Sequence, residues 1–387
     1  MRTRSLAIRN GKVLLASGAI EALDVHTQRG RIAEIGARLR ATDEIDAHGG
    51  FVLPGLIDLH THGLGRESVL SATLHEYARL EAAHGASTFF PTIFAAPNAA
   101  IACIQRHRRA TDDLRALPQV GGFRLESPYL GYAGGGLSKD LAKITPETTR
   151  ALLDAGGGCI RIWDISPELP GAIETIRALC ALGIVCSLGH TQATIEEARA
   201  AVEAGARLVT HLFDTFLPPV MTQQGVYPAG LTDYLLTEDR VVCEIIGDGT
   251  HVHPLLVEVA LRCKGRDGLA FVTDSNVGAA LPDGEYTLPN DWGRILISGA
   301  NNGVRLLDRN MDLAGSALTP IDAFRNAVRM FGRDLATASH LCSRTPARLM
   351  GLNKGEIAPG KDADLIIVDP ALELCATVVG GQVAYQA

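Results

Sequence analysis

The stretch Phe51-Val-Leu-Pro-Gly-Leu-Ile-Asp-Leu-His-Thr-His-Gly63 is the most informative part of the chain. Residues 56–60 are largely apolar and lie between Pro54-Gly55 and a glycine-rich segment, a pattern typical of a short buried strand. Side chains alternate between the two faces of a strand, so His60 and His62 are expected to point to the same side. Neutral imidazole is the commonest protein metal ligand, and the pair therefore suggests a metal site. Two loop histidines bonded to backbone would give the same sequence.

The segments that follow repeat a pattern of buried strand, loop and helix. Helical periodicity lies between most of the strands, as in residues 73–84 and 194–204. Eight buried strands that alternate with helices predict an α/β fold, a closed parallel (β/α)8 barrel of the TIM type. The expected strands are 56–60, 87–94, 121–126, 159–165, 184–190, 208–213, 241–247 and 269–274.

Both ends of the chain have the pattern of short strands with turns. Near the start, Asn10-Gly11 stands between two apolar runs and predicts a β-hairpin. Neither end is long enough to hold a core of its own. We therefore expect residues 1–53 and 353–387 to pair into one small β-sandwich domain, beside a catalytic barrel of residues 54–352.

Composition excludes several classes of function. The net charge is -7 and no long basic run occurs, so neither nucleic acid nor an anionic membrane is expected as a partner. The eight cysteines are scattered, without a Cys-x-x-Cys pair, which argues against a zinc finger or a dithiol redox site. Most lie in apolar runs, as expected for core thiols of a reduced compartment. No stretch is long enough to span a membrane, and we expect a cytoplasmic protein.

Six residues able to bind metal or move protons fall at the ends of the expected strands, where a barrel of this type holds its active site. Taken singly, Asp274 before Ser-Asn would more often be a helix cap, and Glu126 before Ser-Pro a surface residue. Their joint occurrence at strand ends predicts a metal site instead. The six residues are His60, His62, Glu126, His190, His211 and Asp274.

Histidine nitrogens combined with carboxylates suit Zn²⁺ best, with Fe²⁺, Mn²⁺ or Co²⁺ as alternatives. In the simplest arrangement His60 and His62 hold one ion, His190 and His211 hold another, and Glu126 bridges them. One or two ions per chain are therefore expected. Such a site activates water and polarises a carbonyl oxygen. The remaining carboxylate at a strand end, on the eighth strand, would then act as general base.

Several motifs resemble the amidohydrolase superfamily and, within it, the N-acetylglucosamine-6-phosphate deacetylase family. The resemblance runs almost from end to end. It rests on Pro-Gly-Leu-Ile-Asp-Leu-His-Thr-His-Gly from Pro54, Leu-Glu-Ser-Pro-Tyr from Leu125, Gly-His-Thr from Gly189, Thr-His-Leu-Phe from Thr210, Asp-Gly-Thr-His-Val from Asp248, Val-Thr-Asp from Val272, Leu313-Ala-Gly-Ser316 and Gly360-Lys-Asp-Ala-Asp-Leu-Ile-Ile367.

The resemblance implies a homodimer with a barrel and a β-sandwich, which hydrolyses the acetamido group of an N-acetylated amino sugar. It implies that Glu126, His190 and His211 are the principal metal ligands, with Asp274 as catalytic base. His251 would contact the substrate near the reacting carbonyl. Further substrate contacts are expected from Asp214, Thr215, Ala314 and Gly315.

The motifs that hold the sugar phosphate in that family are altered here. The loop at Gly134–Gly136 stands where the family has a lysine-rich stretch that ends in histidine. Thr222-Gln-Gln-Gly225 replaces the Arg-Glu-Pro-Gly whose arginine reaches the phosphate of the neighbouring subunit, and Asp214 replaces an asparagine. Because phosphate needs cations or backbone N–H donors, an unphosphorylated amino sugar is one hypothesis. The other is that Lys139, Ser127 or the glycine loop holds the phosphate.

Two further alternatives remain. An N-acyl amidohydrolase of the D-aminoacylase type would need a cation for a substrate carboxylate, and Arg161 or Lys139 are the candidates. A non-catalytic binding scaffold would be expected to lack the base or a ligand, and this chain keeps both. The related dihydroorotase branch uses a carboxylated lysine on strand four. The expected fourth strand, 159–165, contains no lysine.

Overall fold

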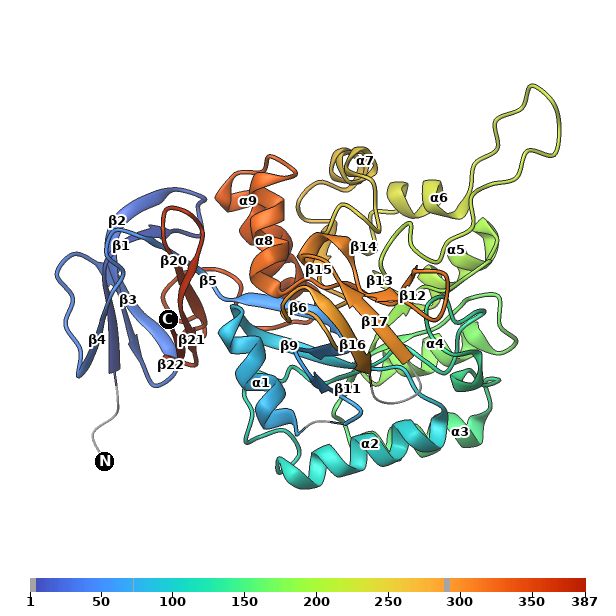
Figure 1. Ribbon diagram of the computed structural model, residues 1–387, viewed down its shortest axis with the longest axis horizontal. Helices are drawn as coiled ribbons and strands as arrows, with labels where there is room; N and C mark the ends of the chain where they lie inside the picture. The colour runs from blue at the N-terminus through green and yellow to red at the C-terminus, as the bar shows by residue number, and fades with distance from the viewer. Residues whose placement is uncertain (1–4, 72, 289–292) are drawn as a thin grey trace.

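The computed structural model describes residues 5–71, 73–288 and 293–387 (Figure 1). Its centre is a single parallel sheet in the order β15-β14-β13-β12-β11-β10-β9-β6. The sheet nearly closes on itself, because the Asp274 N–H after β15 donates to the His60 carbonyl on β6 at 2.8 Å. The predicted (β/α)8 barrel is thus confirmed. Its strands are β6 (Leu56–Thr61), β9 (Ala86–Ile93), β10 (Phe123–Leu125), β11 (Ile160–Asp164), β12 (Val185–Leu188), β13 (Leu208–Val209), β14 (Val242–Ile246) and β15 (Leu269–Val272).

Helices follow most barrel strands and cover the outside of the barrel. Threonines begin several of them: the Thr194 hydroxyl accepts from the Glu197 N–H, and the Glu197 carboxylate accepts from the Thr194 N–H. The helices are α1 (Leu74–Ala83), α2 (Pro97–Ala110), α3 (Pro146–Gly156), α4 (Ala172–Ala181), α5 (Ile195–Ala204), α6 (Leu231–Thr237), α7 (Pro254–Lys264), α8 (Pro320–Arg329), α9 (Leu335–Ser339) and α10 (Thr345–Leu349), with a π-helical segment His340–Arg344 and 3-10 turns Ser138–Asp140 and Ala300–Asn302.

The alternation of side chains on the strands separates an apolar layer from a polar interior. On β10, Phe123 and Leu125 belong to the main apolar core, together with Trp163 of β11. Arg124 lies between them in sequence, is fully buried, and bonds to carboxylates of other barrel strands. The interior of the barrel therefore carries charge directly below the ends of the strands.

The two chain ends share one sheet in the order β22-β21-β20-β5-β1-β2-β3, with β4 paired to β1. Its inward side chains pack together as a second, separate core. The predicted terminal β domain is confirmed in outline (Figure 1). Its boundaries, 1–53 with 353–387 beside 54–352, remain a prediction, and residues 1–4 lie outside the described residues. The strands are β1 (Ser5–Leu14), β2 (Ile20–Gln28), β3 (Arg31–Gly36), β4 (Asp43–Asp46), β5 (Phe51–Pro54), β20 (Leu365–Val368), β21 (Leu374–Val379) and β22 (Gln382–Gln386).

The expected hairpin at Asn10-Gly11 is wrong. Strand β1 continues through both residues, and its partner is β2, with a register shift between Ile8 and Gly11. Asn10 takes a left-handed φ of 56° and its N–H donates to the Asp24 carboxylate at 3.0 Å. A single left-handed residue makes a bulge, whereas a two-residue hairpin turn of type I′ needs two.

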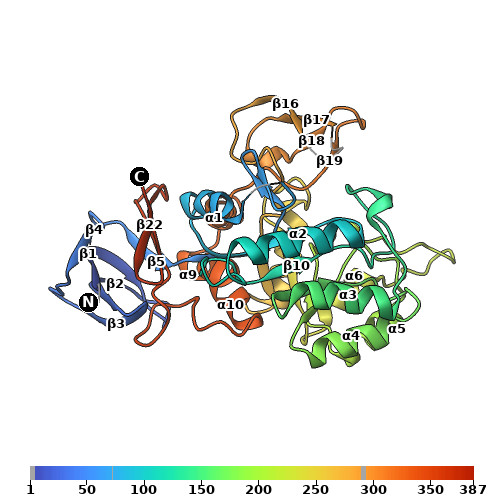
Figure 2. The same ribbon diagram turned by 90° about the horizontal axis from the view of Figure 1, so that it is seen from below.

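A small antiparallel sheet that the sequence pattern did not predict is inserted between β15 and α8. It comprises β16 (Gly284–Leu288), β17 (Gly293–Ile297), β18 (Arg305–Leu306) and β19 (Asp312–Leu313), paired in chain order. Figure 2 shows these strands gathered beside the barrel. A short ribbon of β7 (Gly63–Leu64) and β8 (Glu67–Ser68) follows the first barrel strand. No helix among the described residues is long and apolar enough to cross a membrane.

Candidate active site

The barrel strands end before most of the polar residues predicted at their ends. Glu126 follows β10, His190 comes two residues after β12, and His211 and Asp274 come two residues after β13 and β15. The expected strands 121–126, 184–190, 208–213 and 269–274 were therefore too long. The reason lies in the backbone: φ is +50° at His190, +25° at His211 and +48° at Asp274. Left-handed conformations are costly for such residues, interrupt a strand, and are concentrated at functional sites.

Glu126 lies between the two predicted pairs of histidines. Its Oε2 atom is 3.0 Å from His62 Nε2 and 3.5 Å from His60 Nε2. Its Oε1 atom is 3.0 Å from His190 Nε2 and 3.3 Å from His211 Nε2. One carboxylate thus faces four imidazole nitrogens, two through each oxygen. The structure brings together all five residues that the sequence suggested as metal ligands.

The orientation of the rings suits metal binding. The Nδ1 atom of His62 is 3.0 Å from the Thr92 carbonyl, and that of His190 is 3.1 Å from the Tyr132 carbonyl. A carbonyl oxygen only accepts hydrogen bonds, so each Nδ1 carries the hydrogen. In the neutral ring Nε2 then keeps its lone pair, directed at the cluster. Holding the outer nitrogen on a carbonyl is the usual way in which proteins orient metal-binding histidines.

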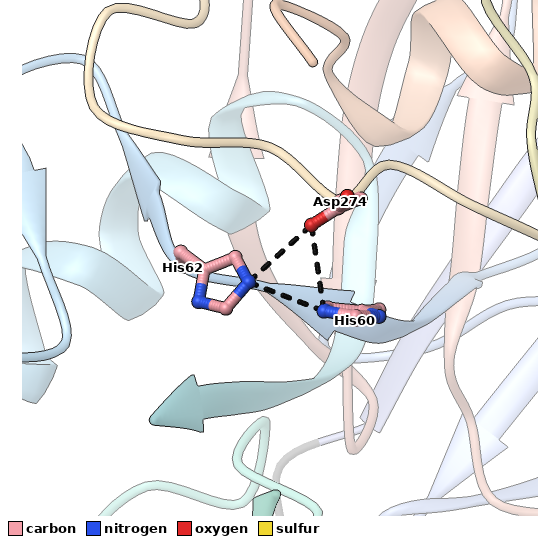
Figure 3. Close-up of side chains that lie close together, drawn as sticks. All are labelled: His60, His62 and Asp274. Atoms are coloured by element: carbon pink, nitrogen blue, oxygen red, sulfur yellow. Dashed lines mark hydrogen bonds and ion pairs between the residues drawn. The ribbon is translucent and has the colours of Figure 1, made fainter. Parts of the chain in front are cut away.

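Asp274 joins the cluster from the opposite side of the barrel seam. Its Oδ1 atom is 3.4 Å from His60 Nε2 and 3.3 Å from His62 Nε2, while the two Nε2 atoms are 3.2 Å apart (Figure 3). Two further groups of ligand atoms are as compact: His60 with Glu126 and His211, and His211 with Asp214 and Asp274. The donor set is therefore mixed nitrogen and carboxylate oxygen, which fits a borderline divalent ion.

Without an ion, the cluster holds protons on its histidines. Burial lowers the pKa of His62, but the charges of Glu126 and Asp274 outweigh burial and raise it to about 10. The pKa of His211 is raised to about 10 in the same way. Burial raises the pKa of Glu126, yet the facing imidazoles bring it well below its usual range, and they lower the pKa of Asp274 too. Both carboxyl groups are thus ionised at neutral pH.

A buried charge network forms the floor of the cluster. Arg124 donates to the Glu244 carboxylate at 2.6 and 3.1 Å and to Asp164 Oδ2 at 3.0 Å. The Oε2 atom of Glu244 lies 3.6 Å from His60 Nδ1 and accepts from the His211 N–H at 3.4 Å. Glu244 therefore contacts one histidine of each pair. Sequence analysis missed these three residues, since single charges inside strands carry no recognisable signal.

A cavity of about 420 Å³ opens above the cluster. The five residues expected to contact substrate, His251, Asp214, Thr215, Ala314 and Gly315, all line it. His251 is held through Nδ1, which donates to Asp248 Oδ2 at 2.7 Å. The remaining ring nitrogen is left for other contacts. A cavity of this size with a few polar groups at its base is typical of a site for a small molecule.

Only some of the candidate phosphate-binding residues line the cavity. The glycine loop, residues 134–136, lines the cavity. The Ser127 hydroxyl is buried and bonded to both polar groups of the Ala95 backbone. Neither Lys139 nor Arg161 is among the described residues that line the cavity, and Arg161 donates to the Met350 carbonyl. Instead, the lining includes Arg309, which sequence analysis missed because it belongs to the unpredicted inserted sheet.

Comparison with known proteins gives consistent matches over the whole chain. The model of the amidohydrolase family matches residues 51–384. An N-acetylglucosamine-6-phosphate deacetylase of Lysinibacillus sphaericus is 31% identical, over 99% of this chain and 98% of that protein. An N-acetylgalactosamine-6-phosphate deacetylase of Escherichia coli O157:H7 is 29% identical, over 97% and 98%. A Mycobacterium smegmatis N-acetyl-D-glucosamine-6-phosphate deacetylase, solved as a mutant in complex with that sugar phosphate, superposes with a TM-score of 0.86 at 28% identity, over 99% and 100%.

Proposed function

Because this chain belongs to the amidohydrolase family and its N-acetylglucosamine-6-phosphate deacetylase branch, we propose that it hydrolyses the acetamido group of an N-acetylated amino sugar. The observation that carries the proposal is the Glu126 carboxylate, which lies between two pairs of histidines at the base of a substrate-sized cavity. The reaction is the hydrolysis of an amide C–N bond, which yields acetate and a free amine.

Divalent metal is the cofactor that this donor set fits. His60 and His62 would hold one ion and His190 and His211 a second, with Glu126 as a ligand available to both; a single ion would be held by Glu126, His190 and His211. Zn²⁺ is the proposed metal, since imidazole and carboxylate together suit it well. An ion bound there supplies Lewis acidity, which activates water and polarises the amide carbonyl.

Side chains of the protein are assigned the proton transfers and the contacts to the substrate. Asp274 is ionised at neutral pH, faces the same cavity and takes the proton of the attacking water. It then returns that proton to the leaving amine, as a general base that becomes a general acid. His251, fixed by Asp248, contacts the amide carbonyl through its free ring nitrogen. Asp214, Thr215, Ala314 and Gly315 orient the sugar by contacts along the wall.

The substrate panel that tests the proposal contains N-acetylglucosamine, N-acetylgalactosamine and their 6-phosphates, because the relatives named above act on the two phosphorylated sugars. Acetate release and metal content by elemental analysis are measured together. Metal in the protein with acetate from a sugar of the panel is the expected result. Metal without acetate from any member would instead favour an N-acyl amidohydrolase acting on another amine.

A homodimer in the cytoplasm is the proposed state of the protein. An arm of residues 217–230 leads into α6 and projects from the body of the molecule in both views (Figures 1 and 2). Apolar side chains are exposed on this arm: Val220 by 76%, Met221 by 64% and Tyr227 by 90%. A patch of this kind is typical of an interface between proteins. All eight cysteines are free thiols, which supports a reducing compartment.

A further inference from the structure

Arg309 lies at the turn between β18 and β19 of the inserted sheet, and its side chain lines the cavity. Among the described residues that form the lining, it is the sole lysine or arginine. The described lining also contains four histidines and four carboxylates. Two of these, Glu126 and Asp274, face the histidine cluster, and Asp214 Oδ2 lies 3.8 Å from His211 Nδ1. Arg309 is thus the cation of the described lining that stays charged whatever the pH.

The charge of Arg309 is not neutralised within the described part of the chain. Its guanidinium makes no hydrogen bond or ion pair there. The neighbouring carboxylate, Asp308, is taken by Arg294, whose Nη2 atom lies 2.8 Å from Asp308 Oδ1 and whose N–H donates to Asp308 Oδ2 at 3.0 Å. Asp312 shares the cavity wall, yet its side chain is exposed and lies beyond ion-pair distance of Arg309. A cation left without a partner at a cavity wall is a recognition element for an anion.

The glycine loop adds backbone donors to the same cavity. A Cβ added at Gly135 would lie 2.7 Å from the carbonyl oxygen of Leu313, so the loop packs directly on β19, the strand that follows the Arg309 turn. The N–H groups of Gly134 and Gly135 make no hydrogen bond with the described residues. Both glycines line the cavity. Free N–H groups and an arginine that line one cavity are the partners that a phosphate or a carboxylate needs.

We propose that Arg309, together with the backbone N–H of Gly135, binds an anionic substituent of the sugar on the cavity wall that the inserted sheet forms. All of these groups come from one subunit. The inference rests on the proposed deacetylase function, and it assigns a specificity-determining residue: Arg309 makes the cavity favour an acetylated amino sugar that carries an anionic group over a neutral one.

The test compares wild type with Arg309→Gln and Arg309→Lys on three acetylated sugars: one neutral, one with a 6-phosphate and one with a carboxylate. A charge-assisted hydrogen bond to an anion is lost in the glutamine variant, so kcat/KM for the anionic sugar falls by roughly 10- to 100-fold. Turnover of the neutral sugar stays within about twofold, and the lysine variant is intermediate. Arg305→Gln is the matched control, because it removes an equal charge from the same sheet, Arg305 is outside the described lining of the cavity, and its bonds run to carbonyl oxygens and leave Asp308 on Arg294.

Calorimetric titration of the metal-loaded protein with glucosamine 6-phosphate, and with glucosamine, supplies a second readout that needs no turnover. Tighter binding of the phosphate by wild type, lost in Arg309→Gln, is the expected result. Equal binding by the two proteins, or equal kinetic losses for neutral and anionic sugars, would overturn the inference while leaving the deacetylase intact. Absence of acetate from every sugar would overturn the deacetylase, and the titration would still decide whether Arg309 binds the anion. The phosphate and carboxylate arms show which anion the site accepts.

Discussion

Asp274 has two possible roles within the cluster, metal ligand and general base, because its Oδ1 atom lies 3.3–3.4 Å from two histidine nitrogens. The proposed mechanism makes it the base. Asp274→Asn is then expected to keep its metal on Glu126, His190 and His211, and to lose roughly 10²- to 10⁴-fold in kcat. Elemental analysis and acetate release measure the two properties on the same sample.

Asp312→Asn is the matched control for this prediction. It removes a carboxylate from the same cavity wall, at an exposed position away from the histidines. Its kcat is expected to change little. If Asp274→Asn lost metal in proportion to activity, Asp274 would be a ligand and the base would have to be another group.

The histidines couple metal binding to proton release. With a pKa of about 10, His62 and His211 are protonated in the metal-free protein at pH 7, whereas coordination needs the neutral ring. Metal binding should therefore release protons, and the apparent affinity should rise as pH approaches 10. Titration calorimetry in two buffers of different ionisation enthalpy measures the number released; an enthalpy that is the same in both buffers would contradict it.

The same raised pKa values determine how the stability of the metal-free protein changes with pH. The pKa values of His62 and His211 are higher in the folded state than in the unfolded chain. Their contribution to the free energy of unfolding is therefore complete below about pH 6.5 and is lost as pH rises through about 10. Chelator-treated protein is expected to unfold at lower denaturant concentration at pH 10 than at pH 7 for this reason.

On strand β14, Glu244 connects the buried charges of the barrel interior to the histidine cluster. It contacts the ring of His60 and the backbone of His211 while Arg124 neutralises its charge. Glu244→Gln is expected to weaken metal binding by about 10- to 100-fold, since outer partners of metal-binding histidines have effects of that size. Competition with a chelator of known affinity measures the change.

Asp164→Asn serves as the comparison for Glu244→Gln. Asp164 is as buried and pairs with the same arginine, but the contacts of the His60 ring run to Glu244 and not to Asp164. Both variants remove one buried negative charge, so both are expected to lower stability. An equal loss of metal affinity in the two would show that general destabilisation, and not the contact to His60, is responsible.

The elements also show which parts of the molecule the sequence predicts. Six of the eight barrel strands are runs of four or more largely buried, mostly apolar residues, and the repeated alternation with helices located the two shorter ones as well, with ends up to four residues out. The ends were misjudged where His190, His211 and Asp274 turn left-handed, because no local propensity favours φ above zero in such residues. The inserted sheet was missed because its last two strands are two residues long each and carry no periodic pattern.

Some residues of the candidate site were likewise predictable from the sequence, and others were not. Residues at strand ends are brought together by the barrel itself, so their assembly was predictable from their order alone. Arg124, Glu244 and Arg309 were not, for two physical reasons. The first two are polar residues inside the barrel, where a charge is recognisable only once its partners are known. The third reaches the cavity from an insertion whose position no strand pattern defines.

For the whole molecule, the arm of residues 217–230 is the proposed contact between two copies. Replacing Val220, Met221 and Tyr227 by serine removes apolar surface that is already exposed in the single chain. The melting temperature at a concentration where the variant is monomeric should fall little, while sedimentation should show a shift from dimer to monomer. A wild-type protein that sediments as a monomer at micromolar concentration would contradict the proposed dimer.

The shared sheet of the two chain ends sets the order in which this protein is completed during synthesis. Strand β5 has its neighbour β1 available on one side once both have been synthesised, but its other neighbour, β20, is made after the entire barrel. Roughly 310 residues separate the two, a delay of roughly 15–60 s at ribosomal rates of about 5–20 residues per second. Throughout that interval the apolar edge at Val52 and Leu53 has no strand beside it. The terminal sheet is thus completed only after the barrel has been made, and a ribosome that stalls before β20 leaves a nascent chain with an open, aggregation-prone edge.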